Sequence, residues 1–546
     1  MKRGLNLFKT EDYWAIWLGL LVIVIAVAFF WSGSTLKPWV VKPGSWSTLA
    51  ELGSDFAKHA GGYVAILFGF GAVFALSMKV MGRDVRQFLL GFVVLFAGAL
   101  AIFYLAGWSI MQKADLGAPL LALLVGLVIG NIKAMPHWIA ASLRTEYYIK
   151  TGIVLLGATL PLTLIAEAGP IAFLQATIVS VTTWLTIYLA ATRLFKLDPR
   201  FGAVLGTGGA VCGVSGSIAI GGAVRADKDH IAIGIGVVSV WAIVMIFTLA
   251  ILTKMMIPLP TVGIAGTPAQ VTPTGAWELS PAEAGAWVGT SEYADAAGFA
   301  VVAEIAEEHG DAAIYAFTLM KVIGRDIWIG IWAFVLSIVS VVYWEKKDDV
   351  NSPHGRVAAT VIWERFPKFV LGFFAATILM SIIAAQAPED RRGMAPMKGT
   401  FKSKAQKANY DADFSSFVVP QNLADRFIID TGSGTISFVG KMSLPDLREI
   451  LKTANSDQAW ALKSLHHESD WYESVLLPKV IDPIKTLRSW AFVLCFLCIG
   501  LSTRFRDLMT FGLKPFWAFT IGVIVNVPLG FILTTKVFVD YWRGLQ

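Results

Sequence analysis

The chain is poor in charge. Of its 546 residues only 15% are Asp, Glu, Lys or Arg, while 56% are hydrophobic. A water-soluble domain carries a larger charged share, because charged side chains cover its surface. Water is therefore not the main solvent of this chain. The composition predicts a polytopic membrane protein of about a dozen helices, each crossing the bilayer with an apolar run of about 20 residues.

Cysteine is scarce as well. Cys212, Cys495 and Cys498 all lie in apolar segments, where a disulfide framework is not expected. Cys495 and Cys498 have the spacing of a redox or metal pair, but buried thiols on a membrane helix are the commoner interpretation. We therefore expect no cofactor and no metal.

Signatures of catalysis are also missing. The chain has no G-x-x-x-x-G-K-[ST] loop, so ATP-driven work by this chain is unsupported. No nucleophile stands with an acid–base partner, which argues against an enzyme. The net charge of +6 does not indicate a nucleic-acid partner, because the basic residues lie in short loops and follow the positive-inside rule. We expect a multi-pass protein of the bacterial inner (plasma) membrane, with the lipid bilayer as its surroundings.

The apolar runs predict thirteen candidate helices. Two of them, 200–224 and 283–303, are weakly hydrophobic. The other candidates are 13–31, 62–80, 87–109, 117–131, 148–166, 170–192, 230–254, 313–344, 361–386, 486–503 and 513–537.

The weakly hydrophobic segments decide the topology. If both cross, the last ten helices form two sets of five that start on opposite sides of the membrane, which is an inverted repeat. If both re-enter, Arg225 and Lys228 become cytoplasmic, and the acidic stretch 255–313, which has no Lys or Arg, becomes external. We favour crossing, because five plus five is a known transporter plan.

The expected fold class is therefore an all-α polytopic membrane protein with an inverted repeat of five plus five helices and interrupted crossing helices. It carries extra N-terminal helices and a small extra-membrane insertion. In the insertion, Phe427–Gly440 predicts two short strands around a Gly-rich turn. The expected divisions are 1–116 (additional helices), 117–256 (first repeat), 257–386 (start of the second repeat), 387–483 (insertion) and 484–546 (last two helices).

Residues 202–222 carry the clearest chemical signal, with eight glycines in one span. Each interior glycine costs a helix about 1 kcal/mol relative to alanine, so a break is expected between Gly208 and Gly213. A break at membrane depth lines a cavity or is buried in protein. The half-helix that resumes there points its positive end at the cavity, which suits an anion. The candidate substrate-binding residues of this segment are Thr207, Gly208, Gly209, Cys212, Gly213, Ser215 and Ser217.

Several sequence blocks resemble the YeiH-like sulfate exporter family. They are "GTGGAVCGVSGSIAI" from Gly206, "LLALLVGLVIGN" ending at Asn131, "KTGIVLLGATL" from Lys150, "WVGTS" from Trp287, "KVIGRD" from Lys321 and "CIGLST" from Cys498. The resemblance covers about 117–254, 285–386 and 484–537. It implies a transporter of small oxyanions or sulfonates, with a fold similar to the sodium–proton antiporter and bile-acid symporter superfamily.

The resemblance adds a second set of candidate residues, Gly289, Thr290 and Ser291. Family members continue with a His-Glu pair one residue later, whereas this chain has Tyr293 and Ala294 there. This chain therefore lacks that His-Glu pair. The coupling ion, a proton or sodium, has Glu146, Glu292 and Asp295 as candidates, because 200–224 holds no acidic residue.

Two further groups have open interpretations. Lys321 and Arg325 share one helical face; they either attract an anion, or Arg325 snorkels or pairs with Asp326. The segment 486–503 holds the fourth place of the second repeat, where a second interruption is possible. Its residues Gly500, Ser502 and Thr503 either line the site or end a helix before Arg504.

The sequence thus predicts a secondary transporter, in the direction of export by the resemblance, of a small anionic substrate such as sulfate, sulfite or a sulfonate. Transport would proceed by alternating access between the repeats. The rival interpretation is a membrane sensor or receptor whose 387–483 segment binds a ligand or partner. Whether the chain forms a homodimer stays open.

Overall fold

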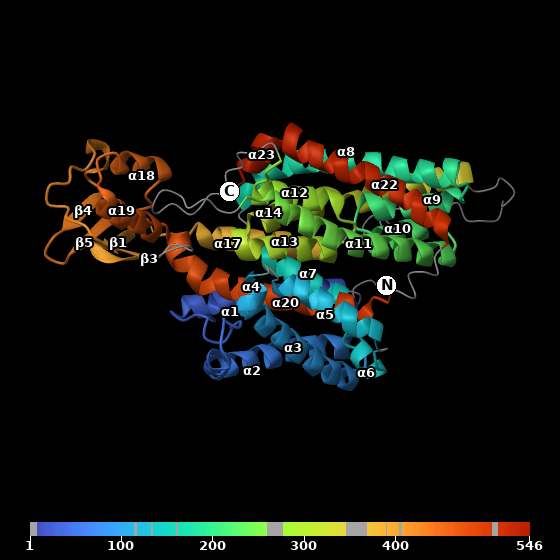
Figure 1. The fold of residues 1–546 in the computed structure, drawn as a ribbon, viewed down its shortest axis with the longest axis horizontal. Helices are drawn as coiled ribbons and strands as arrows, with labels where there is room; N and C mark the ends of the chain where they lie inside the picture. Colours follow the sequence, from blue (N-terminus) through green and yellow to red (C-terminus); the bar gives the residue numbers. More distant parts are fainter. Residues whose placement is uncertain are drawn as a thin grey trace, which may run out of the picture.

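The computed structural model describes residues 8–113, 117–132, 135–159, 162–258, 277–344, 368–388, 390–402, 407–504 and 512–545. The described part is mostly helical (Figure 1). It contains eight helices that are long and apolar enough to cross a membrane: Glu11–Trp31, Leu49–Val80, Val85–Gly107, Gly169–Leu194, Asp229–Met256, Ala312–Val339, Tyr472–Ser502 and Leu513–Val537. The prediction of a multi-pass membrane protein is confirmed at this level.

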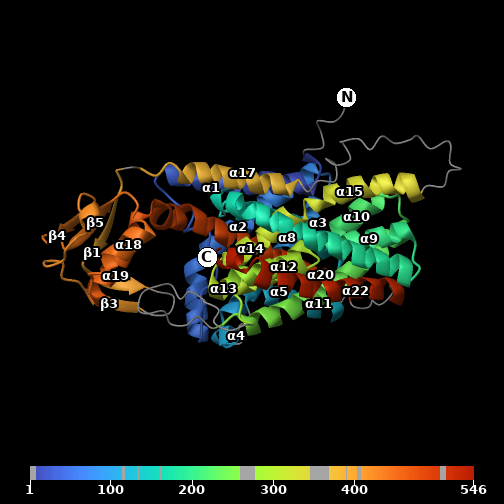
Figure 2. The ribbon, with the colours of Figure 1, turned by 90° about the horizontal axis from the view of Figure 1, so that it is seen from above.

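The helices form two packed groups. The first, the flanking layer, lies in the lower half of Figure 1 and extends behind it. Figure 2 shows α1 and α17 of this layer side by side. The flanking layer consists of α1 (Glu11–Trp31), α2 (Leu49–Val80), α3 (Val85–Gly107), α4 (Ser109–Lys113), α5 (Ala118–Ile132), α6 (His137–Ala140), α7 (Thr145–Gly157), α17 (Phe369–Ala384) and α20 (Asp482–Ser502).

Helices α5 and α20 make the most extensive contact of the flanking layer. Gly126, Gly130 and Gly500 lie where the two backbones meet, and a Cβ on any of them would collide with the opposite backbone. Small residues at such a crossing let helices approach closely, which stabilises helix pairs in membranes. Gly500 is therefore a packing residue of α20.

The second group, the hairpin layer, fills the upper half of Figure 1. A π-helical segment, η3, lies inside the span from Ala312 to Val339, between α14 and α15. The hairpin layer consists of α8 (Leu162–Leu189) with η2 (Ala190–Leu194), α9 (Pro199–Ala210), α10 (Val214–Ala223), α11 (Lys228–Met256), α12 (Pro281–Ser291), α13 (Asp295–His309), α14 (Ala312–Thr318), η3 (Leu319–Arg325), α15 (Trp328–Val339) with η4 (Ser340–Trp344), α22 (Leu513–Ile532) with η7 (Leu533–Val537), and α23 (Val539–Arg543).

The expected crossing of 200–224 is wrong, because this segment folds back on itself. The Arg200 guanidinium donates to the Arg225 carbonyl at 3.4 Å, and the Ser217 hydroxyl donates to the Val204 carbonyl at 3.4 Å. The start of α9 and the end of α10 therefore lie at the same end of the bundle. Gly213, with φ of +69°, allows the reversal between them. We call this segment hairpin 1.

The segment 283–303 also re-enters instead of crossing. The N–H of Leu279, just before α12, donates to the Met256 carbonyl at the end of α11. Near the far end of α13, Glu304 pairs with Lys254 of α11 at 3.3 Å. The start of α12 and the end of α13 thus lie against the same end of α11. We call this segment hairpin 2; it enters the bundle from the end opposite to hairpin 1 (Figure 1).

Other helix boundaries also differ from the prediction. Helix α7 ends at Gly157 and α8 begins at Leu162, so the expected helices 148–166 and 170–192 divide earlier than predicted. Helix α20 runs without a break to Ser502, so the possible interruption of 486–503 is not found. Positions 361–367 of the expected helix 361–386 lie outside the described residues.

Polar contacts join the two layers at one end. Helix α13 packs on α5 and α20, and Glu304 accepts the backbone N–H of Gly117 at 2.7 Å. Asp311, just before α14, pairs with Lys485 at 2.6 Å and with Arg488 at 3.1 Å. Burial alone would raise the pKa of Asp311, but these two cations lower it to about 2.

The insertion has a small core of its own. Strands β4 (Phe427–Asp430) and β5 (Thr435–Val439) pair in antiparallel fashion, which confirms the predicted strand–turn–strand. With β1 (Arg392–Pro396) they form a sheet of order β1-β5-β4, and β2 (Lys398–Lys402) pairs with β3 (Lys407–Asp411). The 3₁₀ turn η5 (Gln421–Leu423), α18 (Leu444–Leu451) and α19 (Ser456–Ser469) complete it, and η6 (Tyr472–Ile481) leads into α20.

Candidate functional site

The tips of the two hairpins touch. Hairpin 1 turns at Val211–Gly213 and hairpin 2 at Glu292–Ala294. A Cβ on Gly213 would collide with the Tyr293 carbonyl oxygen, so the two turns are in van der Waals contact. The predicted break between Gly208 and Gly213 is confirmed, with α9 ending at Ala210. We call this meeting point the junction.

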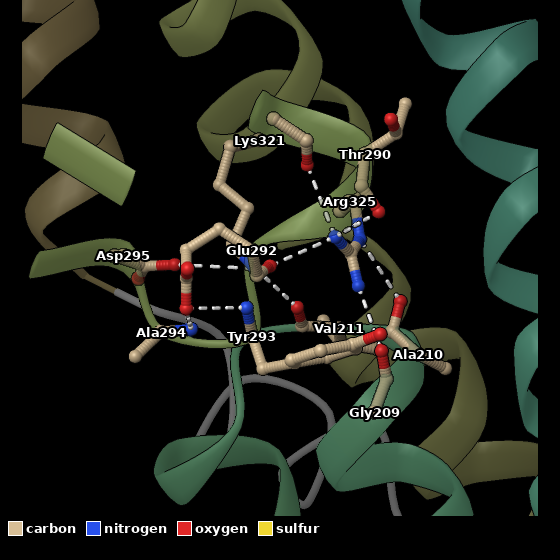
Figure 3. Close-up of polar contacts among 11 residues, drawn as sticks. Gly209, Ala210, Val211, Thr290, Glu292, Tyr293, Ala294, Asp295, Lys321 and Arg325 are labelled. Atoms are coloured by element: carbon tan, nitrogen blue, oxygen red, sulfur yellow. Dashed lines mark hydrogen bonds and ion pairs between the residues drawn. The ribbon is translucent and has the colours of Figure 1, made fainter. Parts of the chain in front are cut away.

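Arg325 holds the junction together (Figure 3). Its guanidinium donates to the Gly209 and Ala210 carbonyls of hairpin 1 at 2.8 and 3.1 Å. It also donates to the Gly289, Thr290 and Glu292 carbonyls of hairpin 2 at 3.0, 2.8 and 3.0 Å. The side chain is fully buried. A single cation thus caps the ends of both entering helices.

Lys321 bridges the same two turns. Its ammonium donates to the Val211 carbonyl at 2.6 Å and to the Glu292 carbonyl at 2.8 Å, and lies 3.9 Å from Asp295 Oδ1. Like Arg325 it is fully buried. Both side chains come from η3, and π-helical turns inside α-helices are frequent at functional sites.

The position of these cations follows from helix electrostatics. The last carbonyls of α9 and α12 have no partner within their own helices and carry the negative end of the helix dipole. Inside a membrane protein such groups must find donors. Lys321 and Arg325 supply them, which satisfies the condition that a charge at membrane depth be paired.

The resuming helices offer the opposite polarity. The first hydrogen bond within α10 runs from the Ser217 N–H to the Gly213 carbonyl, and the first within α13 runs from the Gly298 N–H to the Ala294 carbonyl. The N–H groups before Ser217 and Gly298 therefore have no partner within their own helices. Ser215 on the first turn of α10 is exposed, and Asp295 on the first turn of α13 is partly exposed. Each of the two positive helix ends therefore carries an accessible polar side chain on its first turn.

Three carboxyl groups surround the cations. Glu292 Oε1 accepts the N–H groups of Tyr293 and Ala294 at 2.8 and 3.3 Å. Asp326 follows η3 directly, is only 1% exposed, and neither of its oxygens finds a hydrogen-bond partner in the described part of the chain. Asp295 lies beside Lys321. The junction is thus a mixed-charge centre.

Most predicted site residues lie in the hairpins, but many of their polar groups already make hydrogen bonds within the protein or are buried. The Thr207 hydroxyl donates to the Ala203 carbonyl and accepts the Trp184 indole N–H. The Thr290 hydroxyl donates to the Trp287 carbonyl. Ser215 is the accessible hydroxyl among the hairpin candidates. The remaining hairpin candidates are buried: Gly208, Gly209, Cys212, Gly213, Ser217, Gly289 and Ser291.

Gly500, Ser502 and Thr503 lie elsewhere, at the end of α20 in the flanking layer. The Ser502 and Thr503 hydroxyls donate to carbonyls one turn back, and the Thr503 carbonyl accepts the Asn131 amide. These contacts correspond to a helix end, the second of the two interpretations given above. The structure does not bring these residues to the junction.

Sequence reasoning omitted Asp326 from the site and considered it only as a partner of Arg325. Arg325 instead donates to five carbonyls. The signal that pointed to this region was the density of charge in "KVIGRD", which places three charged residues within an apolar run. Glu146, another ion-coupling candidate, pairs with Lys150 at 3.1 Å and is half exposed, as expected of a loop-side charge.

Fold and junction together define a multi-pass membrane protein with two re-entrant hairpins. A family model described as "Conserved hypothetical protein 698" matches residues 90–390, more than half of the chain. The chain belongs to this family. No solved structure matches it.

Curated relatives carry the name UPF0324 membrane protein. The one from Nitrosomonas europaea is 30% identical over 421 residues, which cover 70% of this chain and 82% of the relative. The one from Rhodopirellula baltica is 32% identical over 353 residues, covering 64% of this chain and 59% of that protein. The match therefore spans less than two thirds of the Rhodopirellula protein. These names support a membrane protein.

Proposed function

We propose that the protein is a secondary transporter of a small oxyanion. The observation that carries the proposal is the junction, where two re-entrant hairpins from opposite ends of the bundle meet with broken backbones. An anchor or a passive span has no use for such a break, because each unpaired backbone group at membrane depth is costly. Broken helices whose ends face a common point are typical of transporter binding sites.

The substrate class follows from polarity. Lys321 and Arg325 neutralise the carbonyl ends of α9 and α12. The N–H ends of α10 and α13 are therefore the helix ends that remain to attract a ligand of opposite charge, an anion. Backbone N–H groups with the Ser215 hydroxyl suit a tetrahedral or planar oxyanion. Sulfate, sulfite or a sulfonate is the substrate that the sequence resemblance adds.

Alternating access is the proposed mechanism, with the hairpin layer moving against the flanking layer. The ion pairs of Asp311 with Lys485 and Arg488 join the two layers at one end, and such pairs can form and break between two states. The opposite entry of the hairpins is compatible with an inverted relation between two halves of the hairpin layer. The proposed location is the bacterial inner membrane. The open end of hairpin 1, which carries Arg200 and Arg225, would face the cytoplasm.

Flux of radiolabelled sulfate, sulfite and a sulfonate into proteoliposomes tests this proposal. In Ser215→Val we expect the KM for the transported anion to rise roughly tenfold, the effect of one lost hydrogen bond to a charged group. In Gly208→Leu we expect no flux, because the new side chain would collide with Ser217 and Val238. Gly69→Leu is the matched control, since Gly69 on α2 has open space around it.

The control is expected to transport like the wild type. Flux that survives unchanged in both Ser215→Val and Gly208→Leu would contradict a binding site at the junction. Absence of flux of all three anions in the wild type would contradict the proposed substrate class.

A further inference from the structure

The junction contains one more carboxyl group than cations. Its described charged groups are Lys321 and Arg325 against Glu292, Asp295 and Asp326. The helix ends do not change this balance, because the two positive ends of α10 and α13 offset the two negative ends of α9 and α12. A buried uncompensated charge is expensive, so one positive charge is missing.

The position of the missing charge is marked by Asp326. Its two oxygens are buried without a donor. One oxygen of Asp326, one of Asp295 and the sulfur of Cys212 lie within 4.8 Å of one another. Two carboxylates this close, with few donors, are stable when they share a proton or hold a cation between them.

A proton fits this place better than a metal ion. A hard cation such as sodium needs several oxygen ligands, but the neighbouring carbonyls of both tips already accept hydrogen bonds from Lys321 and Arg325. The Lys321 ammonium, 3.9 Å from Asp295 Oδ1, would also repel a metal ion. A thiol is a poor ligand for sodium.

We propose that Asp295 and Asp326 share an exchangeable proton and that this proton couples to transport. Asp295 is the entry point, because its side chain is 19% exposed whereas Asp326 is 1% exposed. The charged and titratable groups around the pair are Cys212 of hairpin 1, Glu292 and Tyr293 of the turn that precedes Asp295, Lys321 and Arg325 of η3, and Glu146 and Lys150 of α7.

The coupling follows from where Asp295 lies. It occupies the first turn of α13, beside the N–H groups that are proposed to hold the anion. An ionised Asp295 repels an anion there, and a protonated Asp295 does not. Proton and anion therefore bind together and move in the same direction. This coupling rests on the proposed function, whereas the proton site itself does not.

Infrared spectroscopy of the purified full-length protein tests the proton site without any transport. The wild type is expected to show the C=O stretching band of a protonated carboxyl that shifts in D2O and disappears as the pH is raised. Asp326→Asn is expected to lose this band. Glu11→Gln, which changes a partly buried carboxyl paired with Arg144 inside the flanking layer, is expected to keep it. A wild type without the band, a band that ignores pH, or a band that survives Asp326→Asn would overturn the proposal.

Proteoliposomes test the coupling. With labelled sulfate as the probe, an acidic outside is expected to raise sulfate accumulation by the wild type and by Glu11→Gln several-fold. In Asp326→Asn the ratio of accumulation with and without the pH gradient is expected to fall to unity. A wild type that ignores the gradient, or an Asp326→Asn variant that still follows it, would overturn coupling through this pair. If no sulfate moves at all, the proposed substrate fails, while the infrared titration still decides the proton site.

Discussion

Arg325→Met is expected to prevent assembly of the junction, so that little monodisperse protein is recovered in detergent. The substitution keeps the size of the side chain but leaves five carbonyls of two hairpins without their donor. Each buried unpaired acceptor costs about 1–3 kcal/mol. Five of them together match the whole free energy of unfolding of a typical protein, about 5–15 kcal/mol. Size-exclusion chromatography and thermal unfolding of the purified variant measure the effect.

Two companion variants separate charge from geometry. Arg325→Lys keeps the charge, but an ammonium has only three N–H donors and cannot serve all five carbonyls, so we expect an intermediate loss of stability. Arg193→Met is the control, because Arg193 is exposed. An Arg325→Met variant that unfolds at the wild-type temperature would show that the guanidinium does not hold the hairpins.

Gly213→Ala is expected to abolish transport and to lower the unfolding temperature markedly. Gly213 has a φ of +69°, and a Cβ there would collide with the Tyr293 carbonyl and the Val238 side chain. A backbone conformation with such a positive φ costs a non-glycine residue about 1–3 kcal/mol by itself. The collision adds to this, because it pushes the tip of hairpin 1 away from that of hairpin 2.

Gly33→Ala is a control for the conformational cost of placing a non-glycine residue at a positive φ. Gly33, after α1, has a φ of +79° but nothing within contact distance of a Cβ. We expect this variant to lose only the conformational cost and to keep its transport activity. Equal losses of stability in Gly213→Ala and Gly33→Ala, with transport intact in both, would contradict contact between the hairpin tips.

The sequence was sufficient to locate the break in 200–224, but not to decide whether this segment crosses the membrane or folds back. Eight glycines in 202–222 make a continuous helix unfavourable, and the interruption appears where they are densest, after Gly208 and Gly209. Hydropathy reports only whether a segment is apolar, so it cannot tell a weak crossing helix from a hairpin. The charge of Arg225 was the better signal, since re-entry brings it beside Arg200 at the basic end of the bundle.

The contacts of Lys321 and Arg325 were beyond sequence reasoning for a related reason. Their spacing shows that they share a helical face, but their partners are backbone carbonyls of two segments that lie 29–36 and 110–116 positions upstream. Every residue has a backbone carbonyl, so the residue types do not show which carbonyl a distant side chain will bind. Gly500 shows the reverse error, because a glycine that serves close packing of α5 and α20 resembles one that breaks a helix.

Labelling with a membrane-impermeant thiol reagent tests the central claim, that hairpin 1 re-enters. Arg193→Cys, before α9, and Asp227→Cys, after α10, place thiols at exposed positions on either side of the hairpin, while the native cysteines are buried. In vesicles of one known orientation, re-entry predicts that both positions react from the same face of the membrane. Reaction of the two positions from opposite faces would mean that 200–224 crosses the bilayer, and the junction described here could not exist.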